Sequence, residues 1–148
     1  MLRGLRVMVS GIALAAFTLA GATVALAQEA TAAPTLAFEG DRALMIVLIK
    51  PDKTADFESV VAKYKEALGK SEKPARKQQL AGMKFFKSSQ QEQGNAVYIL
   101  YVDPVVKDEE YDISRVIAEV FPSEVQEIFL KYKDSFAGRA ITPLNKVP

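Results

Sequence analysis

Two short runs of apolar residues constrain the fold of this chain most strongly. Leu44–Ile49 (LMIVLI) is closed by Lys50-Pro51-Asp52, and Ala96–Val102 (AVYILYV) is closed by Asp103-Pro104. Short runs that are rich in branched residues and end at turn signals predict β-strands. Because both runs are apolar at consecutive rather than alternate positions, we expect both faces of these strands to be buried.

Apolar residues at helical spacing predict two helices. The first begins at a Thr54 N-cap and stops at Gly69. The second is interrupted at Phe121-Pro122, after which Ser123 and Gln126 match a capping box that restarts the helix. The expected stripes are Phe57, Val60, Val61, Tyr64 and Leu68 in the first helix; Ile113, Val116, Ile117 and Val120 before the interruption; and Val125, Ile128, Phe129, Tyr132 and Phe136 after it.

The remaining segments complete an alternating order of strands and helices. Met83–Phe86 is predicted to be a strand that forms a hairpin with Ala96–Val102 through a loop turning at Gly94-Asn95, and Ala140–Thr142 a short last strand. Lys70–Gln79 is expected to be a polar connection. The order β-α-β-β-α-β predicts a ferredoxin-like α+β fold, an antiparallel sheet with two helices on one face. Its second face would then be apolar and need a cover, of which a second copy of the chain is the simplest, so we expect a homodimer.

The first 27 residues have the layout of a secretory signal peptide. Arg3 and Arg6 precede an uncharged stretch, Val7–Ala27, that ends in an A-x-A motif at Ala25-Leu26-Ala27. An uncleaved membrane anchor is the alternative, because the uncharged stretch is long enough to span a bilayer. Cleavage predicts an exported protein, periplasmic or secreted and free of the membrane. It would contain a flexible leader at residues 28–42 and a single domain at residues 43–148.

Composition excludes several classes of site. The chain has no cysteine, histidine or tryptophan, which rules out disulfides, zinc sites of the usual nitrogen and sulfur type, His- or Cys-ligated haem, and Cys–His or Ser–His–Asp catalysis. We therefore expect no metal site and no cofactor. Without residues 1–27 the charge is 17 basic against 18 acidic residues, which argues against nucleic acid as the main partner.

Three segments resemble the dimeric α+β barrel superfamily, and within it the small domains similar to antibiotic-biosynthesis monooxygenases. They are the entry into the first helix at Lys50–Phe57 (KPDKTADF), the strand end at Tyr98–Asp103 (YILYVD), and Phe136–Gly138 (FAG) before the last strand. The resemblance covers about residues 43–144 in element order and spacing. It implies that two sheets pair into a barrel whose interior holds a small hydrophobic or aromatic molecule.

Some members of the superfamily that this chain resembles oxidise quinols or polycyclic aromatics without a cofactor, and others degrade haem. Many of the enzymes place a histidine at the break in the last helix or near the haem. This chain has Pro122-Ser123-Glu124 at that break and no histidine at all. The resemblance therefore supports the expected fold more strongly than it supports any enzymatic activity.

Four residues are candidates for binding a ligand: Tyr98, Tyr101, Arg115 and Phe85. The two tyrosines lie three residues apart on one predicted strand, so their side chains should point to opposite faces of the sheet. One would lie under the helices and the other in the barrel interior, where its hydroxyl could bond a ligand; alternatively both are packing residues with satisfied hydroxyls. Arg115 could bind a ligand carboxylate, or pair with Asp112 or Glu119 on its own helix.

Two segments carry opposite charge. Six basic residues lie within residues 70–87, and five acidic residues lie within residues 103–112. They could recruit charged partners, pair with each other across a dimer, or be solvated loops.

Three functions remain open from the sequence. The first is a binding module whose only protein partner is itself and whose interior takes a small hydrophobic or aromatic molecule or is simply filled by core side chains. The second is a cofactor-independent monooxygenase acting on a quinol or aromatic substrate, and the third is a purely structural dimer. The absence of histidine and cysteine favours the binding module over the enzyme, and we assign no catalytic residue.

Overall fold

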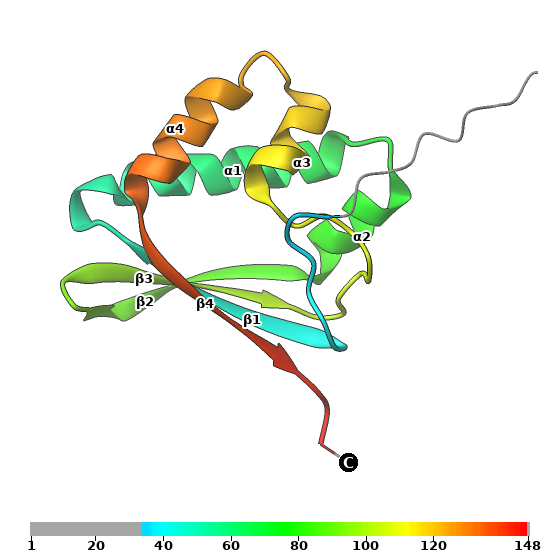
Figure 1. The fold of residues 1–148 in the computed structure, drawn as a ribbon, viewed down its shortest axis with the longest axis horizontal. Coiled ribbons are helices and arrows are strands. Elements are labelled where there is room, and N and C mark those ends of the chain that lie inside the picture. The colour runs from blue at the N-terminus through cyan, green and yellow to red at the C-terminus, as the bar shows by residue number, and fades with distance from the viewer. Residues whose placement is uncertain (1–33, 148) are drawn as a thin grey trace, which may run out of the picture. The chain divides into compact units, whose positions relative to one another are not determined.

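The computed structural model describes residues 34–147, which form an α+β fold on a four-stranded antiparallel sheet (Figure 1). Its strands are β1 (Arg42–Ile49), β2 (Met83–Glu92), β3 (Asn95–Val102) and β4 (Phe136–Leu144), and they lie in the order β2-β3-β1-β4. The two apolar runs are thus the central strands β1 and β3, paired with Ile46 opposite Ile99. The predicted α+β class is confirmed, and the arrangement is compatible with a ferredoxin-like fold. The predicted signal peptide and residues 28–33 of the predicted leader lie outside the described residues.

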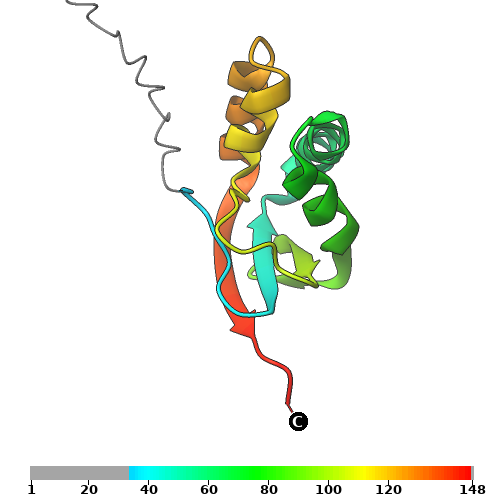
Figure 2. The same ribbon diagram turned by 90° about the vertical axis from the view of Figure 1, so that its right-hand side faces the viewer.

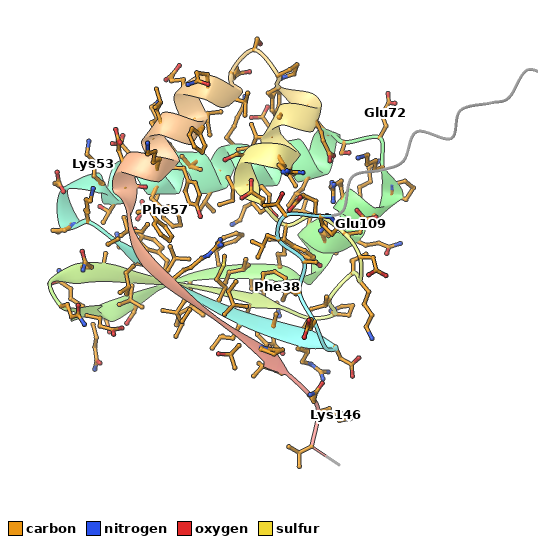
Figure 3. All side chains as sticks on the ribbon, in the orientation of Figure 1. Phe38, Lys53, Phe57, Glu72, Glu109 and Lys146 are labelled. Atoms are coloured by element: carbon orange, nitrogen blue, oxygen red, sulfur yellow. The ribbon has the colours of Figure 1, made fainter. Side chains whose placement is uncertain are left out.

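The helices lie on one side of the sheet (Figures 1 and 2). A single 3₁₀ turn, η1 (Pro51–Lys53), leads into α1 (Thr54–Lys70), and α2 (Pro74–Gly82), α3 (Ile113–Val120) and α4 (Val125–Ser135) follow. All five residues of the predicted α1 stripe are buried, and Phe57 lies between α1 and the sheet (Figure 3). The apolar face of α1 therefore forms the centre of the core, as its periodicity predicts.

The segment between α1 and β3 is more regular than the sequence suggests. The expected connection at residues 70–79 largely folds as α2, which starts with Pro74 in the first turn, a position where the missing N–H of proline costs nothing. The expected loop is also wrong in part, since β2 continues to Glu92. The hairpin itself is confirmed, and it turns at Gln93 and Gly94, whose φ angles are 51° and 78°. Two consecutive positive φ values give the tight turn that matches the twist of the strands.

The last helical region is interrupted where the sequence predicts. α3 ends at Val120, and α4 begins at Val125, after Phe121-Pro122. The predicted capping box is wrong, because Glu124 occupies the N-cap of α4 and no side chain caps it. Phe136 does not end the helix but begins β4, which is longer than the predicted last strand.

A buried arginine joins α2 to α3 and to the loop before α3. Arg76 is 2% exposed, and its guanidinium donates two hydrogen bonds to the Glu119 carboxylate, from Nη2 at 2.7 Å and from Nε at 3.0 Å. Nη1 donates to Glu109, to the side chain of Gln79 and to the backbone carbonyl of Glu110. The basic and acidic segments are therefore paired through Arg76 within one chain, so they are not simply solvated loops.

A buried carboxylate holds the segment that precedes β1. Glu110 is 8% exposed and accepts hydrogen bonds from the backbone N–H groups of Thr35, at 2.7 Å, and Leu36, at 3.0 Å. Phe38 follows, 4% exposed, with its ring centroid 4.6 Å from that of Tyr111. Residues 35–38, within the expected leader, are thus packed onto the domain.

The contacts of Arg76 predict that its replacement destabilises the fold far more than replacement of an exposed lysine does. Replacing Arg76 with Met leaves the Glu109 carboxylate and the Gln79 side-chain oxygen without their donor and removes the two-pronged partner of Glu119. The free energy of unfolding should therefore fall by about 2–4 kcal/mol. The matched control is Lys73→Met, which removes another partner of Glu119, 3.1 Å away but with a side chain 58% exposed. That change should cost less than about 1 kcal/mol. Urea denaturation measures both, and equal losses in the two variants would show that Arg76 is no more than a surface ion pair.

Candidate functional site

The face of the sheet opposite the helices is apolar. Side chains alternate along β1 and β3, so every second residue lies under the helices and is buried. The others point away from the helices, and no element within residues 34–147 covers them. We define the open face by its apolar side chains: Leu44, Ile46 and Leu48 of β1, Phe86 of β2, and Val97 and Ile99 of β3. Phe86 is 52% exposed, and the other five are half-buried.

One end of the open face is polar. Tyr101 lies on this face, and its hydroxyl donates to Oδ2 of Asp103 at 3.0 Å. Arg42 Nε donates to the same oxygen at 2.7 Å. The Arg42 guanidinium holds the pKa of Asp103 below its ordinary value. The three side chains satisfy one another and mark where the apolar surface ends.

Tyr98 lies on the helix side of the sheet, as the spacing of the two tyrosines predicts. It lines a cavity of about 200 Å³ between α1 and β2, together with Val61, Phe85 and Phe86. Its hydroxyl donates to Glu58 Oε1 at 2.6 Å, and Lys87 Nζ donates to the same oxygen at 2.8 Å. Hydrogen bonds from Lys87 and Tyr98 lower the pKa of Glu58, and burial raises the pKa of Tyr98.

Arg115 lies apart from this cavity, in the first turn of α3. Its backbone N–H donates to Asp112 Oδ1 at 3.1 Å, which caps the helix. Its guanidinium lies 3.8 Å from the Glu110 carboxylate. The alternative pairing with Glu119 does not form, because that carboxylate binds Arg76.

The four candidate residues therefore do not form a single site. Phe85 and Tyr98 share one cavity, Tyr101 points to the opposite face, and Arg115 lies on a separate helix. Their roles as ligand contacts remain predictions.

Sequence reasoning missed the charged neighbours of both tyrosines. Lys87 meets Tyr98 through the register of β2 and β3, in which these two residues are paired. Glu58 comes from α1, and Arg42 meets Asp103 across the pairing of β1 and β3. Strand pairing and the packing of α1 on the sheet bring these residues together, and no local pattern in the sequence predicts their contacts.

The comparisons with known proteins add no relative. No family model, no curated protein and no solved structure matches the chain. Within residues 34–147, no helix is both long enough and apolar enough to cross a bilayer. The same residues contain no group of three or more acidic side chains placed to hold a metal ion.

The contact of Tyr98 with Glu58 predicts a change in titration. Tyr98→Phe keeps the ring, which packs edge-on against Phe57 at 4.8 Å, and removes one donor, so the pKa of Glu58 should rise. Lys87→Met should raise the pKa of Glu58 by more than Tyr98→Phe does, because the hydrogen bond from Lys87 has the largest effect on that pKa. Carboxyl ¹³C NMR titration measures both shifts.

The lowered pKa of Glu58 also determines how the stability of the fold should change with pH. A lowered pKa in the folded state stabilises the fold above the unfolded value of about 4.3 and loses that stabilisation as the pH falls through the folded value. The stability difference between the native chain and Tyr98→Phe should therefore shrink in acid. An unchanged Glu58 titration in both variants would contradict the contact.

Proposed function

We propose that this chain is an exported binding module that acts as a homodimer, with the open faces of two copies packed against each other. The observation that carries the proposal is the open face itself, an apolar surface in the middle of the sheet. Soluble monomers rarely expose a contiguous apolar patch larger than a few hundred Å². A second copy covers it without requiring any other protein.

The position of the apolar residues suits a two-fold symmetric contact. Leu44, Ile46, Leu48, Val97 and Ile99 belong to the two central strands, so a two-fold axis through the middle of the sheet would place apolar residues on apolar residues. The Arg42–Asp103–Tyr101 group lies at one end, where it would form part of a polar rim.

The size of the face comes close to what a specific contact needs. Four strands spaced about 4.8 Å apart, with about seven residues each at a rise of about 3.3 Å, project about 450 Å². Two such faces give about 900 Å² before the relief of the side chains is counted, which approaches the lower limit of about 1,000 Å² for specific interfaces. Two sheets packed in this way are the barrel that the resemblance to the dimeric α+β barrel superfamily implies.

A small hydrophobic molecule between the two sheets completes the proposal. The interior would be lined by the aliphatic side chains of β1 and β3, with the Tyr101 hydroxyl at its polar end. That hydroxyl donates to Asp103, so its oxygen is left to accept one hydrogen bond from a ligand. Such a lining would hold an apolar molecule and orient it by one hydrogen bond.

The dimer predicts a clear contrast between two equally exposed residues. Phe86→Lys places a charge in the contact and should convert the dimer to a monomer, because an unpaired buried ammonium is strongly unfavourable. Leu130→Lys changes a residue of α4 that is 47% exposed, comparable with the 52% of Phe86, but lies on the helix side of the sheet. This control should remain a dimer.

Native mass spectrometry of the chain purified from the exported fraction measures the outcome. It reports the N-terminal residue, the oligomeric state and any retained small molecule in one spectrum. A monomer at micromolar concentration would overturn the homodimer, and a chain that retains residues 1–27 would contradict cleavage of the signal peptide. A dimer without additional mass would support the contact and contradict the bound molecule.

A further inference from the structure

A second cavity lies between the C-terminal half of α4 and the start of β4. Its volume is about 260 Å³, and its lining residues are Phe129, Tyr132, Lys133, Phe136 and Arg139. Arg139 pairs across the sheet with Val47, whose side chain lies under the helices. The cavity is therefore on the helix side of the sheet and would stay accessible in a dimer formed through the open face.

Three aromatic rings form the apolar part of this cavity. Phe129, Tyr132 and Phe136 follow one another at spacings of three and four residues, which places them along one side of the chain as it leaves α4. The Tyr132 ring lies 5.9 Å from that of Phe136 and stacks on Phe57 at 6.4 Å, so the core holds it in place. Phe129 belongs to the predicted core stripe, yet it is 42% exposed. The helix thus presents an aromatic ring at the surface.

The charged side chains that line the cavity, Lys133 and Arg139, are both cationic, and Arg139 lies beside the Tyr132 hydroxyl. Neither cation forms an ion pair with a carboxylate among the described residues. No acidic side chain lines the cavity. The Tyr98 cavity differs in this respect, because Glu58 already engages both its lysine and its hydroxyl. Two cations without a carboxylate partner beside an aromatic surface leave a positive site that an anion can neutralise.

We propose that this cavity binds a small aromatic carboxylate. The ring of the ligand packs against Phe129, Tyr132 and Phe136, and its carboxylate accepts hydrogen bonds from Arg139 and Lys133. A guanidinium matches a carboxylate with two parallel hydrogen bonds, and an ammonium adds a point charge. The volume is slightly below the range of about 300–1,000 Å³ for drug-sized ligands, which suits a molecule of one or two rings.

The test uses 2-naphthoate as the probe and the full chain as purified. We expect saturable binding with a dissociation constant of about 1 mM or tighter, and amide NMR shifts confined to the C-terminal half of α4 and the start of β4. The neutral isostere 2-naphthamide should bind at least tenfold more weakly, because it cannot neutralise the two cations. No saturation by naphthoate, or equal affinity for the two probes, would overturn the proposal.

Matched variants separate the charges from the rings. Arg139→Gln combined with Lys133→Gln should weaken naphthoate binding at least tenfold, whereas Lys131→Gln should not, since Lys131 lies outside the cavity and pairs with Glu127 at 2.8 Å. Phe129→Ala should weaken binding at least threefold, and Leu130→Ala, its exposed neighbour, should leave binding unchanged. Equal effects within either pair would contradict the site.

The same titration distinguishes this site from the homodimer contact. Phe86 does not line the cavity between α4 and β4, so Phe86→Lys should bind naphthoate as the unmodified chain does, whatever its oligomeric state. Shifts centred on β1 and β3 of the open face would show that the probe binds there and would overturn the assignment to α4 and β4.

Discussion

The pairing of β1 with β3 is the constraint on which the rest of the structure depends. Both strands are apolar on both faces, and they lie side by side at the centre of the sheet. On one side, α1 covers them with Phe57, Val60, Val61, Tyr64 and Leu68. The other side has no cover among the described elements. One pair of strands thus creates both the core and the surface that we propose as the homodimer contact.

Two buried charged residues, Arg76 and Glu110, hold connecting segments in place. Arg76 joins α2, α3 and the loop between β3 and α3, and Glu110 binds the backbone that precedes β1. A buried guanidinium or carboxylate is tolerated when every polar atom has a partner, and the described residues contain no buried side-chain nitrogen or oxygen without one. These contacts explain how segments without an apolar pattern of their own become ordered.

The two surfaces that we propose for binding lie on opposite sides of the sheet, and they differ in chemistry. The open face is mainly aliphatic, which suits a second sheet. The cavity between α4 and β4 is concave, aromatic and positively charged, which suits a small anion. Because the sheet separates them, a change at Phe86 and a change at Arg139 should act independently.

The sequence by itself determined the α+β class, the two central strands, α1 with its buried stripe, and the break between α3 and α4. These features follow from local periodicity and turn residues, which act over a few positions. It also placed Tyr98 and Tyr101 on opposite faces, since that depends only on the period of a strand.

Only the tertiary structure decided that α2 forms, where β4 begins and that a cavity lies between α4 and β4, because these features depend on residues far apart in the chain. Residues 74–82 have the composition of a polar connection, and they form a helix around Arg76 and Gln79, whose partners come from residues 109–119. Phe136 continues a helical stripe in the sequence, but it pairs with Ile49 of β1 as the first residue of β4. That early change from helix to strand brings Arg139 beside Tyr132 and Phe129, so the aromatic and cationic cavity exists only once α4 and β4 have packed.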